Sequence, residues 1–375
     1  MEICAIICEF NPFHNGHKYL IERAKKLTGC DALVCVMSGS FTQRGEICRT
    51  DKFLRAKHAI LSGADCVLEL PAPFTVAPAE IFARGAVKII SAIPQVKHFA
   101  FGCESCADGG EFEKAARILN NESAEFKSAL NAGLDGGDSY IKSYEAAFEK
   151  CGGKKGLLSS PNNILGVEYA KAVLQSGADI KLTPVKRVGA GYSDGELAGE
   201  YSSAHGIRSN AGDPEIRQSM PECSYVDFIN SRDNTARFGQ MAADYLFTCD
   251  KENLKRVYGC TEGLENRLKN LALGNSFGDI VGFASSKRYS KSRIRRILCG
   301  NLLGLYADET EKFLRSDLSA NILAVKKDRA DEILPLLTTG GSDQCREITS
   351  RTYALWRYLS TPLTYENPNE KMILV

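Results

Sequence analysis

The segment at residues 3–20, ICAIICEFNPFHNGHKYL, places the tightest limits on how this chain can fold. An apolar, β-branched run at residues 3–8 predicts a buried strand, and the apolar spacing after the glycine predicts a helix. His14 and His17 therefore lie on a strand-to-helix turn, where backbone N–H groups and the helix dipole favour an anion. Gly16 puts no side chain in the way of a ligand that approaches this turn.

Two imidazoles three residues apart can both point at one triphosphate. They can donate hydrogen bonds to the oxygens on which charge builds as an α-phosphorus is attacked and pyrophosphate leaves. The turn is not a P-loop, because no Gly-Lys-Ser/Thr ending follows it. Two alternatives remain: half of a zinc site, although no third ligand follows at regular spacing, or a helix start with incidental histidines. The chain has five histidines and two share this turn, which favours nucleotide chemistry with His14 and His17 as catalytic residues and no bound structural metal.

Composition excludes several classes of protein. A length of 375 residues suits two or three domains, and a net charge of +1 argues against a general coat for polyanions, so any nucleic-acid contact must come from a local patch. No apolar segment reaches membrane-spanning length and no leader is evident, which predicts a cytoplasmic protein without a membrane partner.

The 14 cysteines are scattered and are expected to be reduced. Cys103 and Cys106 form a C-x-x-C without a second pair, which leaves an incidental loop pair or a redox or metal pair open.

The order of apolar runs predicts the fold. Further strands are expected at 32–37, 65–70, 96–101 and 180–185, with helices between them at about 50–60, 78–93 and 164–174. This alternation predicts an α/β, Rossmann-like, doubly wound parallel sheet with a helical insertion at about 110–150. Beyond 220, amphipathic helices dominate. The chain is therefore expected to divide into an α/β, nucleotide-binding domain at 1–220 and a mostly α-helical domain at 221–375.

Open α/β sheets bind ligands at the carboxyl ends of their strands. Gly102 and Arg187 fall at two predicted strand ends. The residues singled out as possible phosphate or substrate contacts are Arg44, Lys52, Ser203 and Arg208. A solvated loop is the alternative for the first two.

The densest basic stretch lies at residues 287–296 and also has an apolar helical face. Tyr289 is expected to stack on a base, so the stretch fits a helix that contacts RNA, while a solvated surface helix is the alternative. The predicted RNA-binding residues are Lys287, Arg288, Lys291, Arg293, Arg295 and Arg296.

With these residues in view, the sequence resembles the bacterial tRNA(Met) cytidine acetate ligases, part of a nucleotidyltransferase superfamily marked by a His-x-Gly-His turn. The resemblance covers nearly the whole chain. It rests on EFNPFHNGH at 9–17, MSGSFTQRGE at 37–46, LELP at 68–71, PNNILG at 161–166, TEGLEN at 261–266 and KRY at 287–289.

The resemblance implies a two-step reaction with ATP and Mg²⁺. Acetate attacks the α-phosphorus of ATP to give acetyl-adenylate and pyrophosphate, and the amine of the wobble cytidine of elongator tRNA(Met) then takes the acetyl group, giving N4-acetylcytidine. Acetate and tRNA would be the partners, although the sequence singles out no residues for acetate. By motif, the ATP-binding residues would be Ile7, Cys8, Glu9, Phe10, Asn11, Pro12, Phe13, His14, Asn15, Gly16, His17, Lys18, Tyr19, Leu20, Gly102, Asn162 and Arg187.

One motif departs from the superfamily pattern. The second motif often reads Ser-x-Thr-x-Ile-Arg, whereas this chain has Ser203-Ala-His205-Gly-Ile-Arg208. Two other functions stay open on sequence alone: a small-molecule adenylyltransferase of the mononucleotide or pantetheine-phosphate type, and a non-catalytic RNA-binding protein. The intact His14 and His17 argue against the second.

Overall fold

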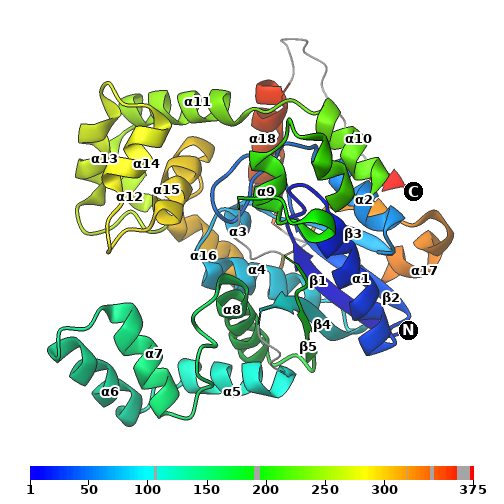
Figure 1. Ribbon diagram of the computed structural model, residues 1–375, viewed down its shortest axis with the longest axis horizontal. Helices are drawn as coiled ribbons and strands as arrows, with labels where there is room; N and C mark the ends of the chain where they lie inside the picture. The colour runs from blue at the N-terminus through cyan, green and yellow to red at the C-terminus, as the bar shows by residue number, and fades with distance from the viewer. Residues whose placement is uncertain (105–107, 190–194, 319, 338–341, 361–371) are drawn as a thin grey trace.

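The computed structural model describes residues 1–104, 108–189, 195–318, 320–337, 342–360 and 372–375 (Figure 1). Its centre is a sheet whose strands, within these residues, lie in the order β5-β4-β1-β2-β3-β6-β7. The strands are β1 (Ile3–Cys8), β2 (Ala32–Ser38), β3 (Cys66–Leu70), β4 (Val96–Cys103), β5 (Lys181–Lys186), β6 (Ile322–Val325) and β7 (Ile373–Leu374).

The first five strands are parallel to one another, as predicted. The chain runs from β1 outward to β3 and then returns to β4 on the other side of β1. The order therefore reverses between β1 and β4, and this switch point is where a doubly wound sheet leaves a crevice for a ligand. Because α1 (Asn15–Thr28) begins at the end of β1, the His-x-Gly-His turn lies at this crevice.

Helices cover both faces of the sheet. On one face, side chains such as those of Ala5 and Val36 pack with α4 (Ala79–Ser91) and α8 (Pro161–Ser176). On the other face, side chains such as those of Ile6 and Cys35 pack with α1 and α2 (Lys52–Leu61). Burial on both sides explains why the strands read as continuous apolar runs rather than as alternating ones.

A helical insertion follows β4, as expected. It comprises α5 (Gly109–Asn120), α6 (Ala124–Asp135) and α7 (Tyr140–Lys150). Figure 1 shows α6 and α7 standing away from the sheet, while α5 lies against α8.

A second cluster of helices follows α9 (Ala204–Ser209) and α10 (Glu222–Asn230). We call residues 235–303 the helical body. It comprises α11 (Thr235–Thr248), α12 (Lys251–Arg256), α13 (Leu264–Ala272), α14 (Phe277–Ala284) and α15 (Lys291–Leu303). It has an apolar core of its own, built around residues such as Leu246, Leu268 and Ile297, and lies to one side of the sheet in Figure 1.

The chain then returns to the sheet through α16 (Ala307–Arg315). Strand β6 pairs antiparallel with β3, and β7 pairs with β6. The remaining elements are α3 (Ala72–Thr75), α17 (Ala330–Ile333), α18 (Asp343–Ser360), η1 (Gly199–Tyr201), η2 (Pro214–Ser219), η3 (Lys327–Arg329) and η4 (Leu334–Leu336), and α18 packs against α3.

This return corrects part of the sequence prediction. A division at residue 220 assigned everything after it to a mostly helical domain, yet β6 and β7 complete the edge of the sheet. The helices at 235–315 agree with the prediction. The two strands were missed because they are short and their partner lies far away in the sequence.

Candidate active site

The His-x-Gly-His turn is held by a reciprocal pair of hydrogen bonds at the start of α1. The Nδ1 atom of His14 accepts from the backbone N–H of Gly16 (3.1 Å), and the Nδ1 atom of His17 accepts from the backbone N–H of His14 (3.3 Å). The two rings lie with their centroids 3.7 Å apart. Because both Nδ1 atoms accept, each neutral ring carries its proton on Nε2, which leaves two N–H donors for a ligand.

Both histidines are held in the neutral form. Burial lowers the pKa of His14 to about 3, and the positive charges of Arg187 and Arg208 act in the same direction. Burial, His14 and Arg187 together lower the pKa of His17 well below its usual value. The turn therefore offers uncharged donors beside two guanidinium groups at neutral pH.

The structure shows a second reason why a glycine is needed at position 16. A Cβ atom at this position would lie 2.8 Å from Cε1 of His14. A side chain here would displace the His14 ring, so the glycine protects the arrangement of the two histidines as well as access to them.

A pocket opens between the turn, the end of β4, the residues after β5 and η1, with a volume of about 450 Å³ including its mouth. It brings together several predicted residues that are far apart in sequence, among them both histidines. Its lining comprises His14, Gly16, His17, Tyr19, Leu20, Gly102, Val185, Lys186, Arg187, Val188, Tyr201 and Ser202.

Gly102 and the segment with Tyr201 and Ser202 contribute to this lining in different ways. A Cβ at Gly102 would lie 3.5 Å from Cγ of Arg187, so the missing side chain leaves room for that arginine. Tyr201 and Ser202 were not anticipated, because they lie in an irregular segment with no periodicity. Asn15 keeps this segment in place, since its Nδ2 donates to the carbonyl oxygens of Glu200 (3.1 Å) and Gln218 (2.8 Å).

Other residues of the predicted ATP site do not line the pocket. The side chains of Ile7, Cys8, Phe10 and Phe13 are buried in the two cores beside the sheet, so only their backbone could reach a nucleotide. Lys18 is exposed and lies 3.9 Å from the carboxylate of Glu22. Pro12 is also buried.

Arg208 of the second motif is bonded to the first motif. Its Nη1 donates to the carbonyl oxygen of Asn11 (2.5 Å) and its Nη2 to Oε2 of Glu46 (3.0 Å). Desolvation raises the pKa of the half-buried Glu9 carboxyl, whose Oε1 accepts from the N–H of Gln43 (2.6 Å). The oxygen of Ser203 accepts from Gly206 N–H (2.9 Å) and caps α9, which presents the arginine.

A buried arginine that sequence reasoning missed supports the same edge. The guanidinium of Arg55 donates to the carbonyl oxygens of Glu9, Ser38 and Gly39, at the carboxyl ends of β1 and β2. Its signal in the sequence is weak, because it is one arginine in a helix whose buried residues also include Lys52 and His58.

Asn162 lies at the start of α8 but outside the pocket lining. Its Nδ2 donates to Oε1 of Glu104 (2.6 Å), and Glu104 also accepts from Ser160 Oγ (3.0 Å) and Asn163 N–H (3.1 Å). The carboxylate thus caps the helix. Cys103, which precedes it, is buried, and Cys106 lies outside the described residues.

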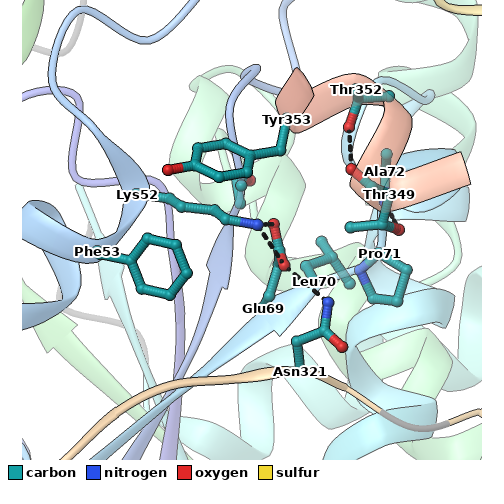
Figure 2. A network of polar contacts seen from close by, with 12 residues as sticks. Lys52, Phe53, Glu69, Leu70, Pro71, Ala72, Asn321, Thr349, Thr352 and Tyr353 are labelled. Carbon is teal, nitrogen blue, oxygen red and sulfur yellow. Dashed lines mark hydrogen bonds and ion pairs between the residues drawn. The ribbon is translucent and has the colours of Figure 1, made fainter. Parts of the chain in front are cut away.

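The structure contradicts the prediction that Lys52 contacts phosphate or substrate. Its ammonium has no solvent exposure and donates to both carboxylate oxygens of Glu69, at 3.0 Å each (Figure 2). Asn321 donates to the same carboxylate (3.0 Å), and the ring of Tyr353 lies 4.1 Å from the ammonium. The lysine is a structural part of the junction between α2, β3 and α18. Arg44 lies half-buried in the loop at 41–47, and its contact with a ligand stays a prediction.

The basic segment at 287–296 does not form one face. Arg288 pairs with Glu262 (2.5 Å), and Arg293 donates to the Gly259 carbonyl oxygen (2.9 Å) and Thr261 Oγ1 (3.0 Å). Burial lowers the pKa of Arg296 to about 10, with Arg293 and Arg44 adding to the effect.

Tyr289 corrects a second prediction. It is buried, its hydroxyl donates to Glu262 (3.2 Å), and it is therefore not available to stack on a base. Only Lys291 and Arg295 of the segment line a cleft, which they share with the loop at 45–49. Lys287 is exposed outside that cleft.

The described part of the chain has neither a metal-binding cluster nor a membrane-spanning helix. No cluster of three or more histidine, cysteine, aspartate or glutamate side chains there is arranged to hold a metal ion. No helix in those ranges is both long enough and apolar enough to cross a membrane.

Comparison with known proteins decides the family. The family model described as HIGH Nucleotidyl Transferase matches residues 1–339. The tRNA(Met) cytidine acetate ligase of Acetivibrio thermocellus is 36% identical over 336 residues, which cover 84% of this chain and 80% of that protein. The chain therefore belongs to the tRNA(Met) cytidine acetate ligase family.

Other members agree. The tRNA(Met) cytidine acetate ligase of Caldicellulosiruptor saccharolyticus is 39% identical over 306 residues, covering 80% of this chain and 76% of that one. The crystal structure of apo Thermotoga maritima TmcAL superposes with a TM-score of 0.79 at 31% identity, covering 96% of this chain and 84% of that chain. A second structure of the Thermotoga protein, bound with alpha-thio ATP, gives a TM-score of 0.77 at 29% identity and the same coverage.

Proposed function

We propose that this family member activates acetate with ATP and transfers the acetyl group to the wobble cytidine of elongator tRNA(Met). The observation that carries the proposal is the pair of neutral histidines, whose Nδ1 atoms are occupied and whose pocket lies at the switch point of the sheet. The relatives' names and the ATP analogue bound to the Thermotoga protein support the substrates.

The first step is displacement at the α-phosphorus of ATP. A carboxylate oxygen of acetate forms the new O–P bond while the bond to pyrophosphate breaks. Negative charge on the phosphate oxygens in the transition state is then stabilised by the Nε2–H groups of His14 and His17 and by the guanidinium of Arg187. Because burial keeps both imidazoles neutral, they act as fixed donors and do not need to transfer a proton.

ATP is expected to enter with Mg²⁺, which neutralises charge between its phosphates. The lining of the pocket contains cationic and apolar side chains but no carboxylate among the described residues. Phosphate oxygens and water would therefore supply the ligands of Mg²⁺, rather than a cluster of acidic side chains.

In the second step, the exocyclic amine of cytidine attacks the acetyl carbon. The new C–N bond forms, the C–O bond to AMP breaks, and the amine loses one proton as AMP leaves. Arg208 connects the His-x-Gly-His turn with the cleft that Lys291 and Arg295 line. It donates to the Asn11 carbonyl oxygen before the turn and to the carboxylate of Glu46, which lines that cleft.

The first step is tested by acetate-dependent exchange of pyrophosphate into ATP. His14→Ala or His17→Ala should each slow the exchange by about 100-fold or more, the scale for one lost transition-state donor. His98→Ala is the matched control, since His98 lies on β4 near Glu2, away from the pocket lining. Near-normal exchange in both turn variants would overturn the assignment.

The second step is tested by mass spectrometry of nucleosides from tRNA incubated with protein, acetate and ATP. N4-acetylcytidine should form only when all three are present. Exchange without acetylated tRNA, but with transfer of AMP to a phosphorylated small molecule, would instead indicate an adenylyltransferase.

A further inference from the structure

A second cleft lies on the other side of Arg208 from the histidine pocket. It opens between the loop at 45–49, α9 and the helical body, and has a volume of about 1170 Å³ including its open mouth. Its lining includes the charged or aromatic side chains of Arg49, His205, Arg208, Phe277, Lys291 and Arg295.

The charges of the cleft favour a polyanion. Four arginine and lysine side chains come from three separate segments of the chain, against two carboxylates, Glu46 and Asp233. Glu46 is already paired with Arg208 (3.0 Å) and lies 3.9 Å from Arg295. Cations that converge from separate elements suit a phosphodiester backbone better than they suit a single phosphate.

One wall of the cleft suits a flat ring. Phe277 is half-buried and lies against buried Phe238, with ring centroids 5.8 Å apart. Beside it, α14 presents Gly278 and Gly282, and a Cβ at Gly282 would meet no other atom within 4 Å. A partly exposed aromatic ring next to a bare helix surface is a platform on which an unstacked base can lie.

The cleft also holds a hydrogen-bond acceptor. Oδ1 of Asp233 accepts from the N–H of Thr235 (2.9 Å), and the carboxylate lines the cleft together with Arg49. A carboxylate oxygen is the acceptor that best suits the exocyclic amine of cytosine.

From this geometry we infer that the cleft binds a single-stranded segment of RNA, with one unstacked nucleotide against Phe277 and its neighbouring phosphates on Lys291 and Arg295. The inference rests on the proposed function, because it deepens the tRNA partner into a specific surface. It also gives a place to His205, the residue that departs from the superfamily's second motif, as part of the cleft wall. Arg208 connects the cleft to the turn where the acetyl-adenylate would form.

The sharpest test fills the cleft. Gly282→Leu places a side chain where nothing opposes it, on a helix that leucine favours over glycine, so the fold should be kept. It should weaken tRNA binding, measured by fluorescence anisotropy, by roughly tenfold or more through steric exclusion. Gly282→Ala is the matched control and should bind tRNA nearly as the unmodified protein does. Acetate-dependent exchange should stay unchanged in both.

A second pair of variants tests the platform. Phe277→Ala should weaken tRNA binding by about tenfold, the scale of one lost base–aromatic stack. Phe283→Ala is its control, because Phe283 is exposed on the same helix but lies outside the cleft. If Gly282→Leu lowers the melting temperature, this pair decides.

The outcomes separate this inference from the proposed function. Loss of tRNA binding in Gly282→Leu and Phe277→Ala, with both controls and the exchange intact, supports the cleft. Unchanged tRNA binding in both variants overturns it. If the unmodified protein gives no exchange and no acetylated tRNA, the proposed function fails, and the same binding comparison still decides whether the cleft holds RNA.

Discussion

The cations at the carboxyl edge of the sheet and those of the segment at 287–296 are held in opposite ways. At this edge, Lys52 and Arg55 are fully buried, and Arg208 is anchored to a backbone carbonyl and a carboxylate. In the basic segment, Lys287 and Lys291 are exposed, whereas Arg288 bonds to Glu262 and Arg293 to the Gly259 carbonyl oxygen. The first group shapes the protein, whereas only part of the second group is placed to meet a partner.

The difference shows what charge density along a sequence can predict. Consecutive residues of a helix point about 100° apart, so the cations of α15, Lys291, Arg293, Arg295 and Arg296, spread over several faces. Lys287 and Arg288 precede this helix. Which of the cations share a surface depends on the neighbours of the helix, here the loop at 45–49 and the loop at 259–261. RNA contact at this segment therefore stays a prediction, and the three-dimensional arrangement divides its cations between the cleft and other neighbours.

The largest effect is expected from Lys52, which tests whether the cations of the first group are structural. Lys52→Met leaves the carboxylate of Glu69 buried without its ammonium partner and should lower the free energy of unfolding by about 3–5 kcal/mol. Urea unfolding followed by circular dichroism measures this. Lys57→Met, at an exposed position of the same helix, should change stability little, and Glu69→Gln added to Lys52→Met should recover part of the loss. Equal stability of the two lysine variants would contradict the structural role.

Arg208 tests whether an anchored cation also matters for chemistry. Arg208→Gln removes the fork that joins Asn11 to Glu46 and should slow acetate-dependent exchange by roughly tenfold, about 1.4 kcal/mol, because the turn is less well positioned. Arg208→Lys keeps the charge without the fork and should recover only part of the rate. Arg217→Gln, which breaks an exposed pair with Glu222, is the control. A normal rate in Arg208→Gln would show that the two motifs are not coupled.

The basic segment can be divided by experiment in the same way. Replacing Lys291 and Arg295 with glutamine should weaken tRNA binding by about tenfold and lower the log–log salt slope by about two, one for each lost phosphate contact. The same change at Lys287 and Arg288, which lie outside the cleft, is the matched control and should leave the slope nearly unchanged. If both pairs lower it equally, the whole segment binds RNA and the division is wrong.

The last expected effect is a dependence of stability on pH, and it concerns the neutral state of His14. Its folded-state pKa of about 3 lies below the value of about 6.5 expected for an unfolded chain, so the unfolded state binds more protons between these values. Stability from this group is complete above pH 6.5 and is lost as the pH falls toward 3, with a slope of at most about 1.4 kcal/mol per pH unit. Urea unfolding of the unmodified protein and of His14→Ala between pH 4.5 and 7.5 measures it. An equally steep decline in the variant would assign the effect to other groups.

Much of the fold was predictable from the sequence because it is written in local patterns. Strands β1 to β3 are buried throughout and mostly apolar, and the turn at 9–17 is formed by hydrogen bonds among neighbours. What was missed depends on distant partners. Lys52 reads as a loop cation until Glu69 and Asn321 are brought beside it, and Tyr289 reads as a stacking ring until Glu262 takes its hydroxyl. Tyr201 reaches the pocket through Asn15, a contact that no sequence period records.

The pairing of β6 with β3 has a consequence for how the protein is made. In the sheet, Cys66 lies opposite Val325, so the open side of β3 must wait until almost the whole chain has left the ribosome. At ordinary rates of synthesis that delay is on the order of tens of seconds. During this time β3 is an exposed, apolar edge of the kind that pairs with other chains. The nascent protein is thus expected to depend on chaperones over this interval, and truncation just before residue 322 should favour aggregation.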